Sequence, residues 1–152
     1  MTEATPSTPT PAVPANRDPA AIAALPIVRS SAHWFWWIAG LSLLNTVLTL
    51  GGTGTQMVVG LGMTLLSDVT FGARSPVGFA IDAAALAFFL VIGRQAARGQ
   101  LWAFYVGTAV YALDALVYVR FQDWMPVALH ALVIYFIFRG VLVLRKGLAG
   151  AA

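Results

Sequence analysis

Four apolar stretches, each about as long as a membrane-crossing helix, constrain this chain more than any other feature. Short breaks that hold glycine, proline or charged residues separate them, and we expect helices over residues 32–51, 76–94, 101–120 and 124–144. A helix needs about 20 mainly apolar residues to cross the hydrocarbon core of a bilayer. The predicted fold class is therefore an all-α membrane protein: a four-helix transmembrane bundle whose helices run up, down, up and down.

The composition excludes most soluble classes of protein. Of the 152 residues, 59% are apolar and only 10% are charged, whereas roughly 25% of residues are charged in soluble domains. The nine lysines and arginines are scattered rather than grouped in a basic run, so nucleic acid is not an expected partner. Cysteine is absent, which excludes disulfides, thiol catalysis and cysteine-bound metal.

Both ends of the chain differ from its apolar middle. Six of the eight prolines lie between Pro6 and Pro26, and a Pro- and Thr-rich stretch of this kind buries too little apolar surface to order itself. We therefore expect residues 1–30 to form a disordered cytoplasmic tail and not a signal peptide. The transmembrane bundle is expected over residues 31–146, followed by a short C-terminal tail over residues 147–152.

The segment between the first two predicted spans leaves the topology open. Residues 55–69 are moderately apolar but contain Gln56, Ser67 and Asp68, so they could cross the membrane, re-enter it or lie at its surface. With four spans and a cytoplasmic N-terminus, seven of the nine basic residues face the cytoplasm, and only Arg74 and Arg120 face outward. A fifth span would remove this positive-inside bias. We therefore predict that residues 52–75 form an outer loop, an interfacial segment or a re-entrant segment.

Each predicted span carries one polar residue at a similar depth, and together we call these residues the buried polar layer. Each lies six residues from the predicted outer end of its helix, or about 9 Å at the rise of an α-helix. A charge that faces lipid is costly, so these side chains should point inward and contact one another. The layer consists of Asn45, Asp82, Asp114 and His130, with Tyr111 and Tyr118 on the face of Asp114 as supporting residues.

Three interpretations of the buried polar layer remain open. It can be a structural lock that fixes the helices, or a chamber in the outer half of the membrane that takes a proton, a cation or a small ligand. The third interpretation is a metal-dependent or acid–base enzyme. It is weakened because zinc sites usually need three protein ligands, and His130 is the only histidine at this depth. His33 lies at the opposite membrane face, which also excludes a haem held by two histidines of one chain.

Several stretches resemble a set of small four-span integral membrane proteins of bacteria to which no activity is assigned. The likeness covers roughly residues 30–145 and is carried by "SAHWFWWIAGLSLLNTVL", "VVGLGMTLLSD" and the succession from Trp102 to Gly140 in "LWAFYVGTAVYALDALVYVRFQDWMPVALHALVIYFIFRG". The resemblance implies a multi-pass protein of the bacterial cytoplasmic (inner) membrane. It implies no catalytic residue, metal or cofactor.

The expected function is that of an integral membrane protein with a structural or accessory role, in which the buried polar layer locks the helices. The alternative is a small transport or proton/cation-linked protein that uses the same four residues as a chamber. We expect both termini in the cytoplasm and the lipid bilayer as the surroundings, with a second copy of the chain or a membrane complex as a candidate partner. No cofactor, metal or catalytic residue is assigned, and an enzymatic role is not favoured.

Overall fold

The computed structural model describes residues 18–51, 61–72 and 75–150. These residues form helices joined by short turns, with no strand among them. The helices are α1 (Pro19–Ala23), α2 (Pro26–Leu50), α3 (Gly62–Phe71), α4 (Pro76–Ala97), α5 (Leu101–Arg120) and α6 (Trp124–Ala149).

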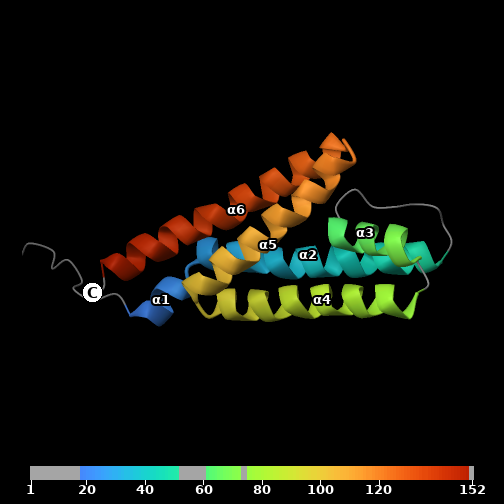
Figure 1. Ribbon diagram of the computed structural model, residues 1–152. Coiled ribbons are helices and arrows are strands. Elements are labelled where there is room, and N and C mark those ends of the chain that lie inside the picture. Colours follow the sequence, from blue (N-terminus) through green and yellow to red (C-terminus); the bar gives the residue numbers. More distant parts are fainter. Residues whose placement is uncertain (1–17, 52–60, 73–74, 151–152) are drawn as a thin grey trace, which may run out of the picture.

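The four long helices, α2, α4, α5 and α6, pack in a closed ring in which each contacts the next. Helix α2 contacts α4 and α6, and α5 contacts the same two helices from the other side. Successive long helices run in opposite directions, as Figure 1 shows. Short turns join α4 to α5 and α5 to α6 and make these neighbours antiparallel, whereas the connection from α2 to α4 contains α3.

Three helices in the described ranges are long and apolar enough to cross a membrane: α4, α5 and α6. Helix α2 is as long, with 25 residues, but His33, Asn45 and three tryptophans lower its mean hydropathy. About a third or less of each apolar stretch in α4, α5 and α6 is buried within the protein. Most of their apolar surface therefore faces outward, which is typical of helices that contact lipid.

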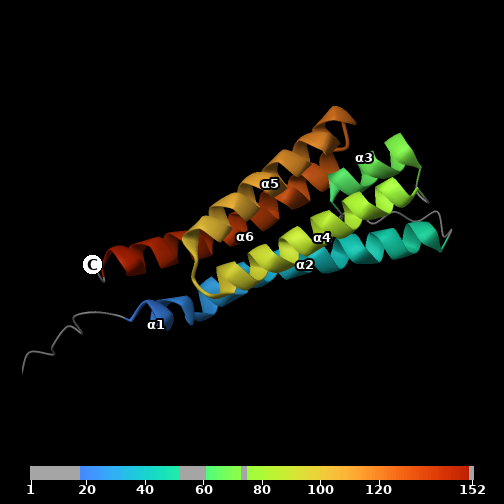
Figure 2. The same ribbon diagram turned by 60° about the horizontal axis from the view of Figure 1, so that its bottom comes forward.

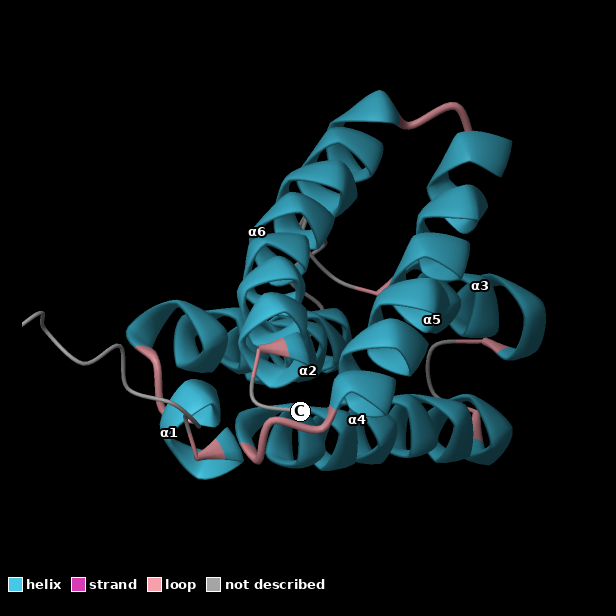
Figure 3. Cartoon of the chain, turned by 90° about the vertical axis from the view of Figure 1, so that its left-hand side faces the viewer, coloured by secondary structure: helices cyan, strands magenta, loops and turns pink. Residues whose placement is uncertain are grey.

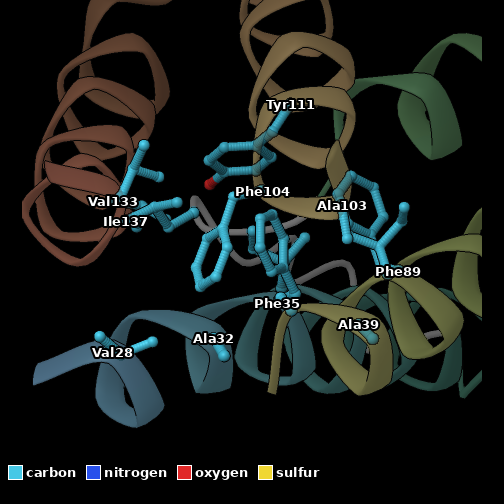
Figure 4. Packing of buried hydrophobic residues seen from close by; sticks show 14 of the residues in the cluster. Val28, Ala32, Phe35, Ala39, Phe89, Ala103, Phe104, Tyr111, Val133 and Ile137 are labelled. Carbon is cyan, nitrogen blue, oxygen red and sulfur yellow. The ribbon is translucent and has the colours of Figure 1, made fainter. Parts of the chain in front are cut away.

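One apolar core lies between the four long helices. Figure 4 shows Phe35 of α2 among Phe89 of α4, Phe104 of α5 and Ile137 of α6. Gly107 allows the close approach of α5, because a Cβ at this position would lie 2.6 Å from Cε1 of Phe35. Small residues at contacts of this kind let helices pack closely where water supplies no driving force.

The turns follow from local sequence. Ser75 caps α4 by accepting a hydrogen bond from the Val77 N–H at 3.2 Å, and Pro76 suits the first helical position, where no N–H bond is needed. Gly99 adopts a φ of 77° between α4 and α5, a left-handed conformation that glycine enters without strain. Gln122, in the turn between α5 and α6, adopts the same left-handed backbone conformation, with a φ of 57°.

The expected boundary of the N-terminal tail needs correction. We predicted disorder through residue 30, but α1 begins at Pro19 and α2 at Pro26, and Ile22 and Val28 are buried in the core. The reason is packing: α1 lies against the last turns of α6, where a Cβ on Gly147 would approach Cγ2 of Ile22 to 2.6 Å. Residues 1–17 lie outside the described residues.

The last helix is also longer than predicted. We expected its span to end near residue 144 and a C-terminal tail to begin at 147, whereas α6 continues to Ala149. Leu144 is fully buried, and Leu148 packs against the core. The contact with α1 thus extends the helix beyond the predicted apolar stretch.

Part of the segment between the first two predicted spans is the ten-residue helix α3. Helix α3 packs against α4 and α5, and Figure 2 shows it between the α2–α4 pair and the α5–α6 pair, at the end where the pairs diverge. Residues 52–60 lie outside the described residues. The close contact of α3 with the long helices brings backbone groups to the predicted buried polar layer.

Candidate functional site

The carboxylate of Asp114 is the centre of a buried hydrogen-bonded cluster. Its Oδ2 accepts from the backbone N–H of Gly62 at 2.7 Å, and its Oδ1 accepts from the N–H of Met63 at 2.8 Å. The Oδ2 atom also lies 3.0 Å from Nε2 of His130 on α6. We name these groups, Asp114, His130 and the N–H groups of Gly62 and Met63, the Asp114 cluster.

The Asp114 carboxylate lies at the N-terminus of helix α3. The first N–H groups of an α-helix have no acceptor within the helix, and those of Gly62 and Met63 point at Asp114. The helix dipole adds a partial positive charge at the same end, which favours an anionic neighbour. Asp114 therefore satisfies two backbone donors that would otherwise be buried without partners.

The imidazole of His130 bridges two acceptors. Its Nδ1 lies 2.8 Å from the carbonyl oxygen of Pro126, one turn earlier in α6. A carbonyl only accepts, so Nδ1 carries a hydrogen. The contact between Nε2 and Asp114 then needs one more proton, either on Nε2 or on the carboxyl group. In both forms the pair of side chains has no net charge, which lowers the cost of placing it in an apolar interior.

The surroundings place backbone donors on the carboxylate and aromatic rings on the imidazole. Two backbone N–H groups donate to Asp114. The ring of Tyr111 stacks on the imidazole with centroids 4.2 Å apart, and that of Tyr118 lies 5.4 Å away.

Water has little access to this cluster. Asp114 is 4% exposed and His130 is 1% exposed. Tyr111 and Tyr118, predicted as supporting residues, cover the imidazole, and both are buried. The two tyrosines therefore shield the pair and strengthen its electrostatic attraction.

Close backbone contact makes glycine necessary at the start of α3. A Cβ at position 62 would lie 2.9 Å from Cε2 of Tyr118 and 3.0 Å from the backbone oxygen of Asp114. The neighbouring N–H of Leu61 donates to Oγ of Ser42 on α2 at 3.2 Å. The start of α3 is thus hydrogen-bonded on one side to α5 and on the other to α2.

The structure brings two of the four predicted members of the buried polar layer, Asp114 and His130, together. Asp114 and His130 are in direct contact, whereas Asp82 accepts a hydrogen bond from Oγ1 of Thr46 at 3.2 Å. Asn45, next to Thr46 in α2, is 9% exposed. The start of α3 lies between α2 and α5, since the Leu61 N–H bonds to Ser42 of α2 and the Gly62 N–H bonds to Asp114 of α5.

Sequence reasoning missed the backbone donors of Gly62 and Met63. The signal was present in "GLGMTLLSD", because a glycine before a short apolar run allows a helix to start close to another backbone. The stretch matches no phosphate-binding loop. Side-chain patterns on the long helices could not show that the acceptor of these N–H groups is Asp114.

The protein itself fills most of the hydrogen-bonding positions of the Asp114 carboxylate. Three of the roughly four acceptor positions of the Asp114 carboxylate are occupied by protein donors. Within the described part of the chain, no three His, Asp or Glu side chains gather closely enough to share a metal ion. Figure 3 shows how α5 and α6 rise together to their connecting turn with α3 beside α5, the place where the cluster lies.

Comparisons with protein-family models, with curated proteins and with solved structures gave no match to this chain. The functional proposal therefore depends on the geometry of the residues themselves.

Proposed function

We propose that this chain is an integral membrane protein of the bacterial cytoplasmic membrane, in which α2, α4, α5 and α6 form a four-helix transmembrane bundle. Three of these helices have the length and hydropathy for it, and α2 packs against α4 and α6. Asn45 and Ser42 of α2 are buried against other helices. The polar residues that lower the hydropathy of α2 therefore do not all face lipid.

The distribution of charge supports cytoplasmic termini. The end of the bundle that holds the C-terminus carries six basic residues, and in the described ranges the other end carries Arg120. Basic residues concentrate on the cytoplasmic side of membrane proteins. The six are Arg29, Arg94, Arg98, Arg139, Arg145 and Lys146.

Helix α3 serves in this proposal as part of a re-entrant segment on the outer side. Its start is buried beside Asp114 within the apolar length of α5, and its end leads to Pro76 at the outer end of α4. Large apolar side chains such as Leu66 and Val69 are exposed on its outer surface. Non-helical backbone at membrane depth is tolerated when it is buried in protein, and the Asp114 cluster supplies that burial.

The role that the geometry supports best is structural or accessory: the Asp114 cluster locks the re-entrant helix to the α5–α6 hairpin. The bonds from the Gly62 and Met63 N–H groups to Asp114 carry this proposal. The alternative, a transport chamber formed by all four layer residues, receives less support because most acceptor positions of the Asp114 carboxylate are filled by protein donors.

The structural role is tested by the stability of Asp114→Asn in detergent micelles or lipid nanodiscs. Removing one partner of a buried charged pair costs about 3–5 kcal/mol, so the variant should unfold at a clearly lower temperature. Asp123→Asn is the matched control, because Asp123 is exposed and makes no side-chain capping bond at the start of α6. Equal unfolding temperatures for Asp114→Asn and the wild type would refute the structural role.

A further inference from the structure

A basic hollow of about 520 Å³ lies between α1, α2 and α4. Figure 1 shows these helices meeting at the end of the bundle that holds the C-terminus. Arg29, His33 and Arg98 line the hollow, and alanines of α1 and α4 and the ring of Trp36 form the rest of its wall. We name it the Arg29 hollow. No residue of this wall carries a carboxylate.

The arginines of the Arg29 hollow have unused hydrogen-bond donors. Among the described residues, ion pairs are confined to the Asp114 cluster, so no carboxylate there neutralises Arg29 or Arg98. Asp18, which precedes α1, accepts from the N–H of Ala20 at 2.9 Å instead. One N–H of Arg98 donates to Oε1 of Gln95 at 3.3 Å. An arginine has five N–H donors, so most of those in the hollow remain for a ligand.

A hollow with two positive charges and many donors selects for an anion with several oxygen atoms. Guanidinium groups bind phosphate oxygens in pairs, with geometry that favours them over other acceptors. Arg29 comes from α2 and Arg98 from the end of α4, so the two side chains approach the hollow from different helices. A phosphate group offers oxygen atoms to both.

An apolar groove continues from the Arg29 hollow along α2. It is lined by His33, Trp36, Trp37 and Gly40, and it shares His33 and Trp36 with the basic hollow. A Cβ at Gly40 would meet nothing within 4 Å, whereas a Cβ on Gly93 of α4 would collide with the indole of Trp36. The glycine of α4 therefore lets the Trp36 ring lie close to α4, and Gly40 leaves space beyond it. We name this feature the Trp36 groove.

The length of the Trp36 groove matches one leaflet of a membrane. From Arg29 to Gly40 the helix α2 advances by about 16 Å, which is about half of the roughly 30 Å hydrocarbon core of a bilayer. Trp36 is 41% exposed and Trp37 is 63% exposed, so the groove opens to the outside of the bundle. Charge thus lies at one end of the stripe and apolar surface along the rest.

We propose that the Arg29 hollow and the Trp36 groove together bind one anionic phospholipid of the cytoplasmic leaflet. Its phosphate group lies between the guanidinium groups of Arg29 and Arg98, and one acyl chain follows Trp36 and Trp37 to Gly40. Basic pockets on the cytoplasmic side of membrane helices bind lipid headgroups by the same chemistry. The site rests on the proposed function, because the proposed orientation places this end of the bundle in the cytoplasmic leaflet.

The test is native mass spectrometry of the full chain in detergent micelles, titrated with dioleoylphosphatidylglycerol. Dioleoylphosphatidylcholine is the matched lipid, with the same acyl chains and no net charge. We expect one phosphatidylglycerol molecule to bind at least about tenfold more tightly than phosphatidylcholine, as expected for two arginines beside an anionic headgroup. Equal affinities for the two lipids would overturn the site.

Competition with inorganic phosphate separates the two sources of a phosphate group. Sodium phosphate at the concentration of the lipid should leave phosphatidylglycerol bound, because it gains nothing from the Trp36 groove. Displacement of the lipid at that concentration would assign the Arg29 hollow to free phosphate and overturn the lipid proposal.

Two variants locate the site, and a third serves as a control. Arg29→Gln/Arg98→Gln should lower the affinity for phosphatidylglycerol about tenfold or more. Gly40→Trp fills the groove at an open position and keeps both charges, and it should weaken the same lipid although the headgroup site is intact. Arg145→Gln removes an exposed charge at the same end of the bundle but outside the hollow, and it should bind as the wild type does.

The outcomes separate this site from the proposed orientation. Unchanged affinity in both the double arginine variant and Gly40→Trp would overturn the site, and so would an equal loss in Arg145→Gln, which would indicate general attraction by charge. Lipid selectivity in micelles does not depend on orientation, which cysteine labelling of the turns in intact cells measures. Reversed labelling with retained selectivity would overturn the cytoplasmic placement alone, whereas the expected labelling without selectivity would overturn the lipid site alone.

Discussion

The carboxylate of Asp114 on α5 and the imidazole of His130 on α6 lie 3.0 Å apart, in a cluster that also holds the first two N–H groups of α3. A turn of three residues joins α5 to α6, so the two side chains face each other at equal depth on neighbouring antiparallel helices. The Asp114 cluster thus connects α3, α5 and α6. The effect of changing it can be measured in each of these helices.

The first prediction concerns the protons of His130. Because the Pro126 carbonyl oxygen can only accept, Nδ1 of His130 should carry a hydrogen. Nitrogen-15 NMR of the histidine-labelled protein in micelles measures this directly, with His33→Gln used to assign the signals. A spectrum in which Nδ1 of His130 carries no hydrogen would contradict its bond to Pro126.

Much of the fold could be predicted from the sequence because hydropathy and helix-starting prolines dominate it. The expected spans beginning at residues 76, 101 and 124 begin there in the structure. The N-terminal boundary failed because composition alone could not show that α1 packs on the end of α6 through Ile22 and Gly147. Tertiary contact ordered a stretch whose local sequence indicates disorder.

The site was predictable only in part, because some of its hydrogen-bonding groups belong to the backbone. The equal depth of Asp114 and His130 follows from the turn between their helices, and the structure places them in contact. Asp82 was expected in the same group, and the structure gives it a hydrogen bond from Thr46 of α2 at 3.2 Å. Backbone N–H groups carry no side-chain pattern, so the partners at Gly62 and Met63 had to be found in three dimensions.

Replacing both Asp114 and His130 separates the contribution of their ion pair to stability from that of the N–H bonds of α3. An isolated buried ion pair can often be replaced by apolar residues with little loss of stability. In Asp114→Leu/His130→Leu, however, the N–H groups of Gly62 and Met63 would lose their acceptor, at a cost of about 1–3 kcal/mol each. We expect the double variant to remain less stable than the wild type in thermal unfolding. Wild-type stability would show that the two N–H bonds contribute nothing.

Two glycines form a matched pair for the contact between α3 and α5. Gly62→Ala should lower the unfolding temperature, because the new Cβ would lie within 3.0 Å of Tyr118 and of the Asp114 backbone. Gly40→Ala in α2 meets nothing within 4 Å and should be neutral or stabilise the protein by up to about 1 kcal/mol. Similar effects of the two substitutions would contradict the close approach of α3.

The membrane topology predicts opposite labelling of two exposed glutamines. Gln122 lies in the turn between α5 and α6, and Gln100 lies in the turn between α4 and α5 at the other end of the bundle. The chain has no cysteine, so single cysteines report without background. In intact cells a membrane-impermeant maleimide should label Gln122→Cys and not Gln100→Cys. The reverse pattern would invert the proposed orientation, and labelling of both would refute the crossing of α5.

The most direct test of the central claim is amide hydrogen exchange at Gly62 and Met63. The first N–H groups of a helix have no acceptor within it, so their protection must come from Asp114. We predict slow exchange at both amides in the wild type. In Asp114→Asn, exchange should be about tenfold or more faster at both amides and unchanged at buried Phe104 in α5. Rapid exchange of both amides in the wild type, or equal rates in the two proteins, would contradict the claim that Asp114 holds α3 in place.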